Sequence, residues 1–168
     1  MSVSLRTPTL ADSRDFLAAV ERSRRLHRPW LEAPADANAY RAYCERIARD
    51  DNEGFLMVED GGDLVGYATI GNIVRARFQS AYLGFAAFEP FAGRGLMRTG
   101  VRLVLAEAFD VLGLHRVEAN VQPQNARSSA LVQALGFRLE GHSPRYLFID
   151  GSWRDHDRYA ITREEWGR

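Results

Sequence analysis

The stretch AYLGFAAFEPFAGRGLM, residues 81 to 97, joins an apolar, strand-like run to two glycines around one arginine. From Leu96 to Leu112 apolar residues recur at helical spacing, and Gly113 follows as a helix breaker. A glycine-rich turn from strand into helix leaves backbone N–H groups free at the positive end of the helix dipole, where phosphate oxygens bind well. The stretch therefore predicts a phosphate-holding turn. Its spacing fits neither a dinucleotide fingerprint nor a P-loop, so a turn that needs glycine only for its backbone is the alternative.

Outward from this stretch, helical and strand-like periods alternate along the chain. Helical spacing is expected within residues 7 to 26, 40 to 47 and 125 to 136, and the proline-containing segment 27 to 38 is expected to be a loop. Strands are expected at residues 3–7, 54–59, 64–74, 79–88 and 116–122, followed by a hairpin at 145–162 that turns at Asp150-Gly151. This order predicts one mixed α/β domain over residues 1–168.

Composition excludes several classes of function. The chain has 22 basic and 22 acidic residues, so no net positive field favours nucleic acid or an anionic membrane as a partner. Neither a signal peptide nor a long apolar span is evident, and the single cysteine allows no internal disulfide, so we expect a cytoplasmic protein. Cys44 lies on the inner face of the second helical pattern and is interpreted as a packing residue rather than a nucleophile. Monomer and homodimer both remain open.

Two further patterns invite a functional reading. Asp155, His156 and Asp157 resemble a metal cluster, but side chains alternate along a strand, so His156 would point away from its neighbours and no metal site is predicted. The basic run from Arg22 to Arg28 is interpreted as a solvated face, with a docking site for an acidic partner as the alternative.

A resemblance to a known family rests on three stretches, namely YLGFAAFEPFAGRGLMRTGVRLVLAEAF, HRVEANVQPQNARSSALVQALGF and YLFIDGSWRDH. Together with VGYATIGNIVRARF they resemble the GNAT superfamily of acetyl-coenzyme A (acetyl-CoA) dependent N-acetyltransferases, and within it the ribosomal-protein-alanine branch. The similarity runs from about Leu5 to Trp166. It implies a twisted, mostly antiparallel sheet of six to seven strands, flanked by about four helices and splayed between the fourth and fifth strands. It also implies acetyl-CoA as the cofactor.

The same resemblance implies which residues bind the cofactor. The pyrophosphate would lie on the backbone of the turn and first helical residues Ala92, Gly93, Arg94, Gly95, Leu96, Met97 and Arg98. The pantetheine arm would lie along the strand residues Phe85, Ala86, Ala87 and Phe88 and near Asn125. Ala92 departs from the family pattern, which begins with Gln or Arg, so one side-chain contact is missing.

Transfer of an acetyl group to an amine needs a neutral nucleophile and protonation of the departing thiolate. An α-amine, with a pKa near ~8, is about a tenth neutral at pH 7, whereas a lysine is neutral less than about one time in a thousand. Glu118, on the polar face of its strand, is the expected base, with deprotonation through water as the alternative and Glu89 as a poorer candidate. Leu147 stands where some relatives carry an acid. Many relatives also have a tyrosine at the position of Val132, and Ser128 is implied instead as the group that meets the thiolate.

Aromatic side chains occur in the loop and strands that the family uses for its acceptor slot, although core packing explains some of them equally well. They are Trp30, Phe78, Tyr82, Tyr146 and Trp153. We therefore expect an N-acetyltransferase whose acceptor is the N-terminal α-amine of a protein or peptide, in particular of a ribosomal protein. A small-molecule amine such as a polyamine or aminoglycoside is the alternative acceptor, and a non-catalytic acyl-CoA-binding module is the alternative of another class.

Overall fold

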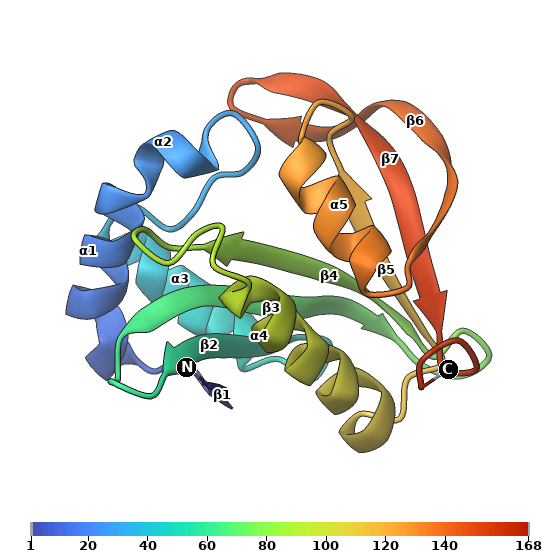
Figure 1. The fold of residues 1–168 in the computed structure, drawn as a ribbon, viewed down its shortest axis with the longest axis horizontal. Coiled ribbons are helices and arrows are strands. Elements are labelled where there is room, and N and C mark those ends of the chain that lie inside the picture. The colour runs from blue at the N-terminus through green and yellow to red at the C-terminus, as the bar shows by residue number, and fades with distance from the viewer. Residues whose placement is uncertain (1, 168) are drawn as a thin grey trace.

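The computed structural model describes residues 2 to 167, and its strands form one seven-stranded sheet (Figure 1). The strands are β1 (Val3–Arg6), β2 (Glu53–Glu59), β3 (Leu64–Val74), β4 (Ser80–Ala87), β5 (Arg116–Val121), β6 (Arg138–Ile149) and β7 (Ser152–Thr162). Their order is β1-β2-β3-β4-β5-β7-β6, and all neighbours run antiparallel except β4 and β5, which are parallel. The predicted mixed α/β fold with a mostly antiparallel sheet is confirmed.

The strands β4 and β5 pair at one end only. Their register runs from Ser80 opposite Arg116 to Tyr82 opposite Glu118, although β4 continues to Ala87 and β5 to Val121. Figure 1 shows the two strands diverging from this point toward the α2 side of the molecule. The expected splay is therefore present, and the edge of β4 beyond Tyr82 offers backbone groups that β5 does not use.

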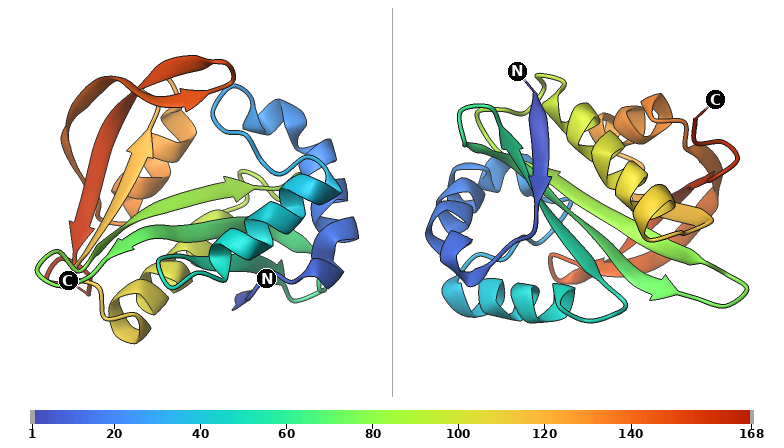
Figure 2. Two further views of the ribbon diagram at one scale, coloured as in Figure 1. Left: turned by 180° about the vertical axis from the view of Figure 1, so that it is seen from behind. Right: turned by 90° about the horizontal axis from the view of Figure 1, so that it is seen from below.

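Helices cover both faces of the sheet (Figure 2). One face carries α1 (Ser13–Arg22), α2 (Arg24–His27) and α3 (Ala37–Ile47), and the other carries α4 (Leu96–Ala106) and α5 (Ala126–Ala134). Alternate residues of β2 serve the two cores, because Leu56 packs in the cluster with α1 and α3 while Phe55 and Met57 pack in the cluster with α4. No helix within residues 2–167 is long and apolar enough to cross a membrane.

The expectation of one helix across residues 7 to 26 is wrong. A short 3-10 turn at Leu10–Asp12, capped by Thr9, precedes α1, which ends at Arg22. The Ser23 hydroxyl donates to the Ala19 carbonyl at 2.6 Å and accepts from the Glu89 backbone N–H at 2.9 Å. Such side-chain bonding to the previous turn competes with the helix, so the chain turns there and continues as α2.

The helix after the glycine turn also differs from its predicted form. The helix α4 ends at Ala106, and residues Glu107–Val111 form a π-helical turn before Gly113, whose φ is 66°. The predicted breaker is correct, because a left-handed φ of this size favours glycine. The predicted hairpin turn at Asp150-Gly151 is confirmed as well, since both residues have positive φ.

Cys44 lies at the margin of the core rather than fully inside it. It packs against the cluster formed by α1, α3 and Leu56 and is partly buried. Burial raises the pKa of its thiol above the ordinary value, which keeps the thiol protonated. This environment suits the predicted packing role.

Candidate active site

The turn between β4 and α4 presents free backbone N–H groups. Gly95 is the N-cap residue of α4 with a φ of 80°, and Gly93 has a φ of 77°. At both glycines no atom lies within 4 Å of the position that a Cβ would occupy. Because no side chain caps α4, its first-turn N–H groups remain available at the positive end of the helix dipole. The turn therefore fits a phosphate group, as the sequence predicts.

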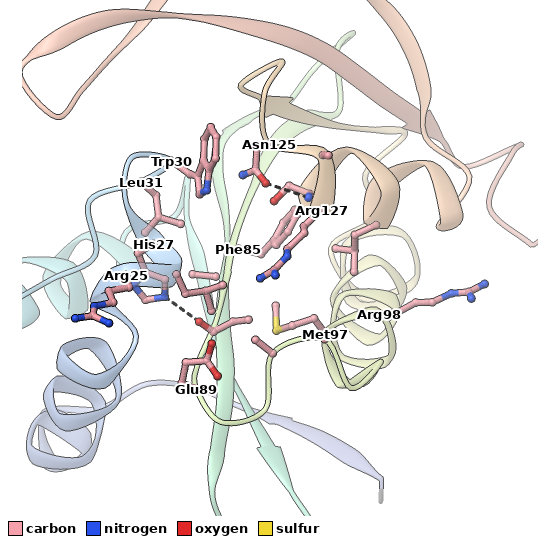
Figure 3. Close-up of a pocket in the computed structure, with 18 of the residues that line it drawn as sticks. Arg25, His27, Trp30, Leu31, Phe85, Glu89, Met97, Arg98, Asn125 and Arg127 are labelled. Atoms are coloured by element: carbon pink, nitrogen blue, oxygen red, sulfur yellow. Dashed lines mark hydrogen bonds between the residues drawn. The ribbon is translucent and has the colours of Figure 1, made fainter.

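A cavity of about 810 Å³ opens beside this turn (Figure 3). This volume is typical of a site for a sizeable ligand. The cavity is lined by Arg25, Leu26, His27, Trp30, Leu31, Phe85, Ala86, Ala87, Glu89, Ala92, Gly93, Gly95, Met97, Arg98, Gln124, Asn125, Ala126, Arg127, Ser128 and Leu131. The free edge of β4 thus lies between the glycine turn and the start of α5.

Most residues that were predicted to bind the cofactor line this cavity. The predicted residues that do so are Phe85, Ala86, Ala87, Ala92, Gly93, Gly95, Met97, Arg98, Asn125 and Ser128. Three others do not line it. Phe88 and Leu96 are buried in the two hydrophobic cores, and the Arg94 guanidinium lies over the Phe91 ring, 5.9 Å from its centroid. Arg94 and Leu96 still contribute their backbone to the turn, whereas the Phe88 N–H donates to Val65 and its carbonyl accepts from Phe91.

Three arginines give the large cavity a positive charge. Arg25, Arg98 and Arg127 line it, against one carboxylate, that of Glu89. Figure 3 shows the Arg127 side chain reaching between α5 and the turn, whereas the Arg25 and Arg98 side chains extend outward from the cavity. The Arg98 guanidinium donates to the Ala134 carbonyl at 3.4 Å. Cations around free N–H groups complement a phosphorylated ligand more strongly than the turn alone.

The arginines of the basic run from Arg22 to Arg28 make different contacts. Arg22 donates from Nε to the Glu89 carbonyl at 2.6 Å, which ties α1 to the segment after β4. Arg24 pairs with Glu21, and Arg25 lines the large cavity. At least part of this run therefore serves the fold and the cavity.

A smaller cavity of about 180 Å³ lies at the splay between β4 and β5. It shares Trp30, Leu31, Phe85, Asn125 and Ser128 with the large cavity, so the two meet. Its remaining lining residues are Leu83, Gly84, Ala119, Asn120, Val121, Gln122, Leu147, Ile149 and His156. No Asp or Glu belongs to the described lining. The two cavities form one passage with a cationic end and a largely apolar end.

A family model described as an acetyltransferase (GNAT) domain matches residues 2–138. The chain belongs to the GNAT acetyltransferase family. Mycobacterium smegmatis RimJ in complex with CoA-disulfide superimposes with a TM-score of 0.90 at 29% sequence identity, covering 99% of this chain and 84% of that one. The resemblance that the sequence suggested is confirmed, and so is the fold that it implied.

Two curated relatives differ in the acceptors that they are named for. The ribosomal protein uS5-alanine N-acetyltransferase of Escherichia coli (strain K12) is 37% identical over 111 residues, which is 66% of this chain but only 57% of that protein. The spermidine N(1)-acetyltransferase of the same strain is 25% identical over 171 residues, covering 98% of this chain and 88% of that protein. Membership of the GNAT family therefore does not identify the acceptor, which has to be inferred from the residues of the site.

Asn125 and Ser128 lie where the two cavities of this GNAT domain meet. Asn125 is the N-cap residue of α5, and its Oδ1 accepts from the Ser128 backbone N–H at 3.2 Å. Both residues line both cavities. The Ser128 hydroxyl has no hydrogen bond to another residue of the described part of the chain. It is therefore free to donate to a ligand atom at the junction.

Glu118 lies at the last paired position of β4 and β5, outside the lining of both cavities. Its Oε1 accepts from Nε of Arg116 at 2.9 Å, and the same guanidinium also binds Glu140. The Arg116 guanidinium and the Glu118 carboxylate thus form an ion pair. The role of Glu118 as a base stays a prediction, and this position gives it no direct contact with the cavities.

The five predicted acceptor-slot aromatics are not gathered in one place. Trp30 lines both cavities, whereas Phe78 and Trp153 are exposed on the surface, 71% and 60% respectively. Tyr82 and Tyr146 lie near each other beside the splay, where burial, followed by a hydrogen-bonding interaction with Tyr146, raises the pKa of Tyr82. Of these five aromatics, Trp30 is the one that lines the passage.

Three hydrogen bonds hold the loop that carries Trp30. The Gln122 side chain donates to the carbonyls of Pro29 and Trp30, both at 3.2 Å, and the Asp150 backbone N–H donates to Glu32 Oε1 at 2.7 Å. The loop is therefore tied to the residue that follows β5 and to the turn between β6 and β7. These ties position it as a wall of the small cavity.

Several lining residues were not predicted from the sequence. Arg25, His27, Leu31, Asn120, Arg127 and His156 come from five separate segments that only the fold assembles. One signal was available for Asn120, because the strict alternation of β5 places it on the same face as Glu118 and Gln122. For His27, whose Nε2 donates to the Ala87 carbonyl at 2.8 Å, no local pattern pointed to the site.

Proposed function

We propose that this GNAT domain is an acetyl-CoA-dependent N-acetyltransferase that acetylates the α-amine of a protein or peptide. More specifically, we propose a ribosomal protein as the acceptor. The choice of a peptide α-amine as acceptor is supported by the small cavity, whose described lining contains no carboxylate. A polyamine carries several positive charges and is best bound by acidic groups, whereas the end of a peptide brings one amine. The cationic large cavity also disfavours a polycation.

The residues of the large cavity suit the binding of the acyl donor. Acetyl-CoA, when bound, supplies a thioester carbonyl that is already activated toward an amine. The N–H groups of the Gly93–Gly95 turn and the side chains of Arg25 and Arg127 would hold its phosphates. The free edge of β4 beyond Tyr82 would hydrogen-bond its amide-containing arm, as a neighbouring strand would.

Ser128 and Trp30 would act at the junction of the two cavities. The Ser128 hydroxyl would donate a hydrogen bond to the sulfur that leaves, at the positive end of the α5 dipole. Trp30, held by Gln122, would exclude water from the same place and orient the acceptor. Both roles require only that the amine arrives through the small cavity.

A comparison of acceptors tests the proposal. We expect a short peptide with a free N-terminal alanine to be acetylated with a kcat/KM at least about tenfold above that of spermidine, because its single amine matches a site without carboxylates. Release of coenzyme A thiol measures both rates. A higher kcat/KM for spermidine would contradict the peptide acceptor, and binding of acetyl-CoA without turnover of any amine would favour a non-catalytic acyl-CoA-binding module.

A further inference from the structure

We propose that His156 is the general base that accepts a proton from the acceptor amine, an assignment that rests on the acetyltransferase function proposed above. Among the described residues that line the small cavity, His156 is the one whose side chain titrates near neutral pH. This cavity lies at the splay of β4 and β5, where it meets Ser128 and the end of the large cavity. A base is needed at that place, because the amine must lose a proton there.

One hydrogen bond fixes which nitrogen of His156 can act. Its Nδ1 lies 3.0 Å from the Arg154 carbonyl oxygen, and a carbonyl can only accept, so Nδ1 carries the hydrogen. In the neutral ring Nε2 then holds the lone pair. No described residue of the chain donates a hydrogen bond to Nε2. A positioned imidazole with one nitrogen anchored and the other free is the usual arrangement of a histidine base.

The surroundings of His156 favour the neutral, basic form. The residue is 2% exposed, and this burial lowers its pKa below the ordinary value of 6.5. The Arg154 carbonyl and then the carboxylates of Asp155 and Asp157 act in the opposite direction, with the smaller effect. From β6 the Tyr146 ring faces it at 6.1 Å, and the Arg154 guanidinium turns to the Ile149 carbonyl.

The proposed step balances in atoms and charge. As the amine nitrogen bonds to the carbonyl carbon, Nε2 of His156 accepts one N–H proton and the ring becomes cationic. The carbon–sulfur bond breaks and its electron pair leaves with sulfur, which receives a hydrogen bond from Ser128. The proton then passes from His156 through solvent to the thiolate, so an amide and a thiol are formed and the imidazole is neutral again.

His156 is better placed for this step than Glu118. The Glu118 carboxylate is bound by Arg116 and belongs to the lining of neither cavity. His156 lines the small cavity, and no residue within the described range 2–167 hydrogen-bonds to its Nε2. The two candidates therefore predict opposite results when each is replaced.

The test replaces His156 by Asn, whose amide N–H can still donate to the Arg154 carbonyl. We expect H156N to lower kcat at pH 7 by about 10², the range for loss of a general base, with acceptor KM and the Kd of coenzyme A within about threefold of wild type. H142N is the matched control, because His142 is 46% exposed, lies between Asp155 and Asp157, and lines neither cavity. It should retain wild-type kcat.

The pH dependence separates a base from a residue that only supports the fold. Below the pKa of His156 the wild type loses both neutral amine and neutral base, so log kcat/KM should steepen from a slope of about one to about two. H156N should keep a slope of about one, and its deficit should shrink as the pH falls. In the wild type, the midpoint of the His156 imidazole titration by NMR should coincide with the steepening, which requires no variant to fold.

Three results would overturn the assignment. They are a kcat of H156N above half of wild type, a His156 titration that does not coincide with the change of slope, and a deficit found in E118Q instead. If the wild type acetylates spermidine but no peptide, only the proposed acceptor is wrong. H156N and wild type are then compared with spermidine as the acceptor, and this comparison tests the role of His156. If it acetylates no amine, both proposals fail.

Discussion

Replacing Ser128 by Ala is expected to lower kcat by roughly 10 to 10³, the range for losing one well-placed donor to a developing negative charge. Ser128 lines both cavities in the first turn of α5, and its hydroxyl is not engaged by another described residue. The lost bond exists mainly as the thiolate forms, so the Kd of coenzyme A should change by less than about threefold. Steady-state kinetics and calorimetry measure the two quantities.

Ser129 is the matched control for Ser128. The next residue of a helix points about 100° away around its axis, and Ser129 belongs to the lining of neither cavity. S129A should therefore leave kcat near the wild-type value. If both variants lose activity equally, or if neither does, Ser128 is only a residue of the helix start.

Replacing Gly95 by Val is expected to weaken coenzyme A binding by about 10- to 100-fold. Gly95 has a φ of 80° at the N-cap of α4, and a β-branched residue strongly disfavours this conformation. The turn would then shift, and the N–H groups that face the cavity would lose their common direction. Calorimetric titration with coenzyme A measures the loss.

Gly113 supplies the control for backbone strain. It also has a left-handed φ, of 66°, with open space around its Cβ position, but it follows the α4 segment and lines neither cavity. G113V should lower the melting temperature by a similar amount to G95V and leave the Kd of coenzyme A unchanged. Equal affinity of G95V and wild type would refute a phosphate site at this turn.

The elements of the fold were predictable where the signal is local. The glycines at 93 and 95, the breaker at Gly113 and the turn at Asp150-Gly151 each need a left-handed φ, and the sequence shows that need directly. The split at Ser23 was missed. The Ser23 hydroxyl bonds to Ala19 in the previous turn, but its second partner is Glu89, which lies 66 residues further along the chain. Periodicity within one segment carries no information on such a partner.

The candidate site was predictable only in part, for the same reason. Asn125 and Ser128 follow from a helix start and a resemblance, and both line the passage. Alternation along β5 correctly puts Glu118 on its polar face, but the bond from Arg116, two residues before it, was not anticipated. His156 was considered only as a metal ligand. Its place in the small cavity depends on how β7 lies beside β5, which is a property of the whole sheet.

Selectivity for the α-amine is tested with one peptide that has a free N-terminal α-amine and one internal lysine, beside the same peptide blocked at its N-terminus. After incubation with acetyl-CoA at pH 7, fragment mass spectrometry locates the acetyl group. We expect acetylation at the α-amine, which is far more often neutral than the lysine, and little or no product from the blocked peptide. Acetylation of the lysine at equal rates in both peptides would contradict this expectation.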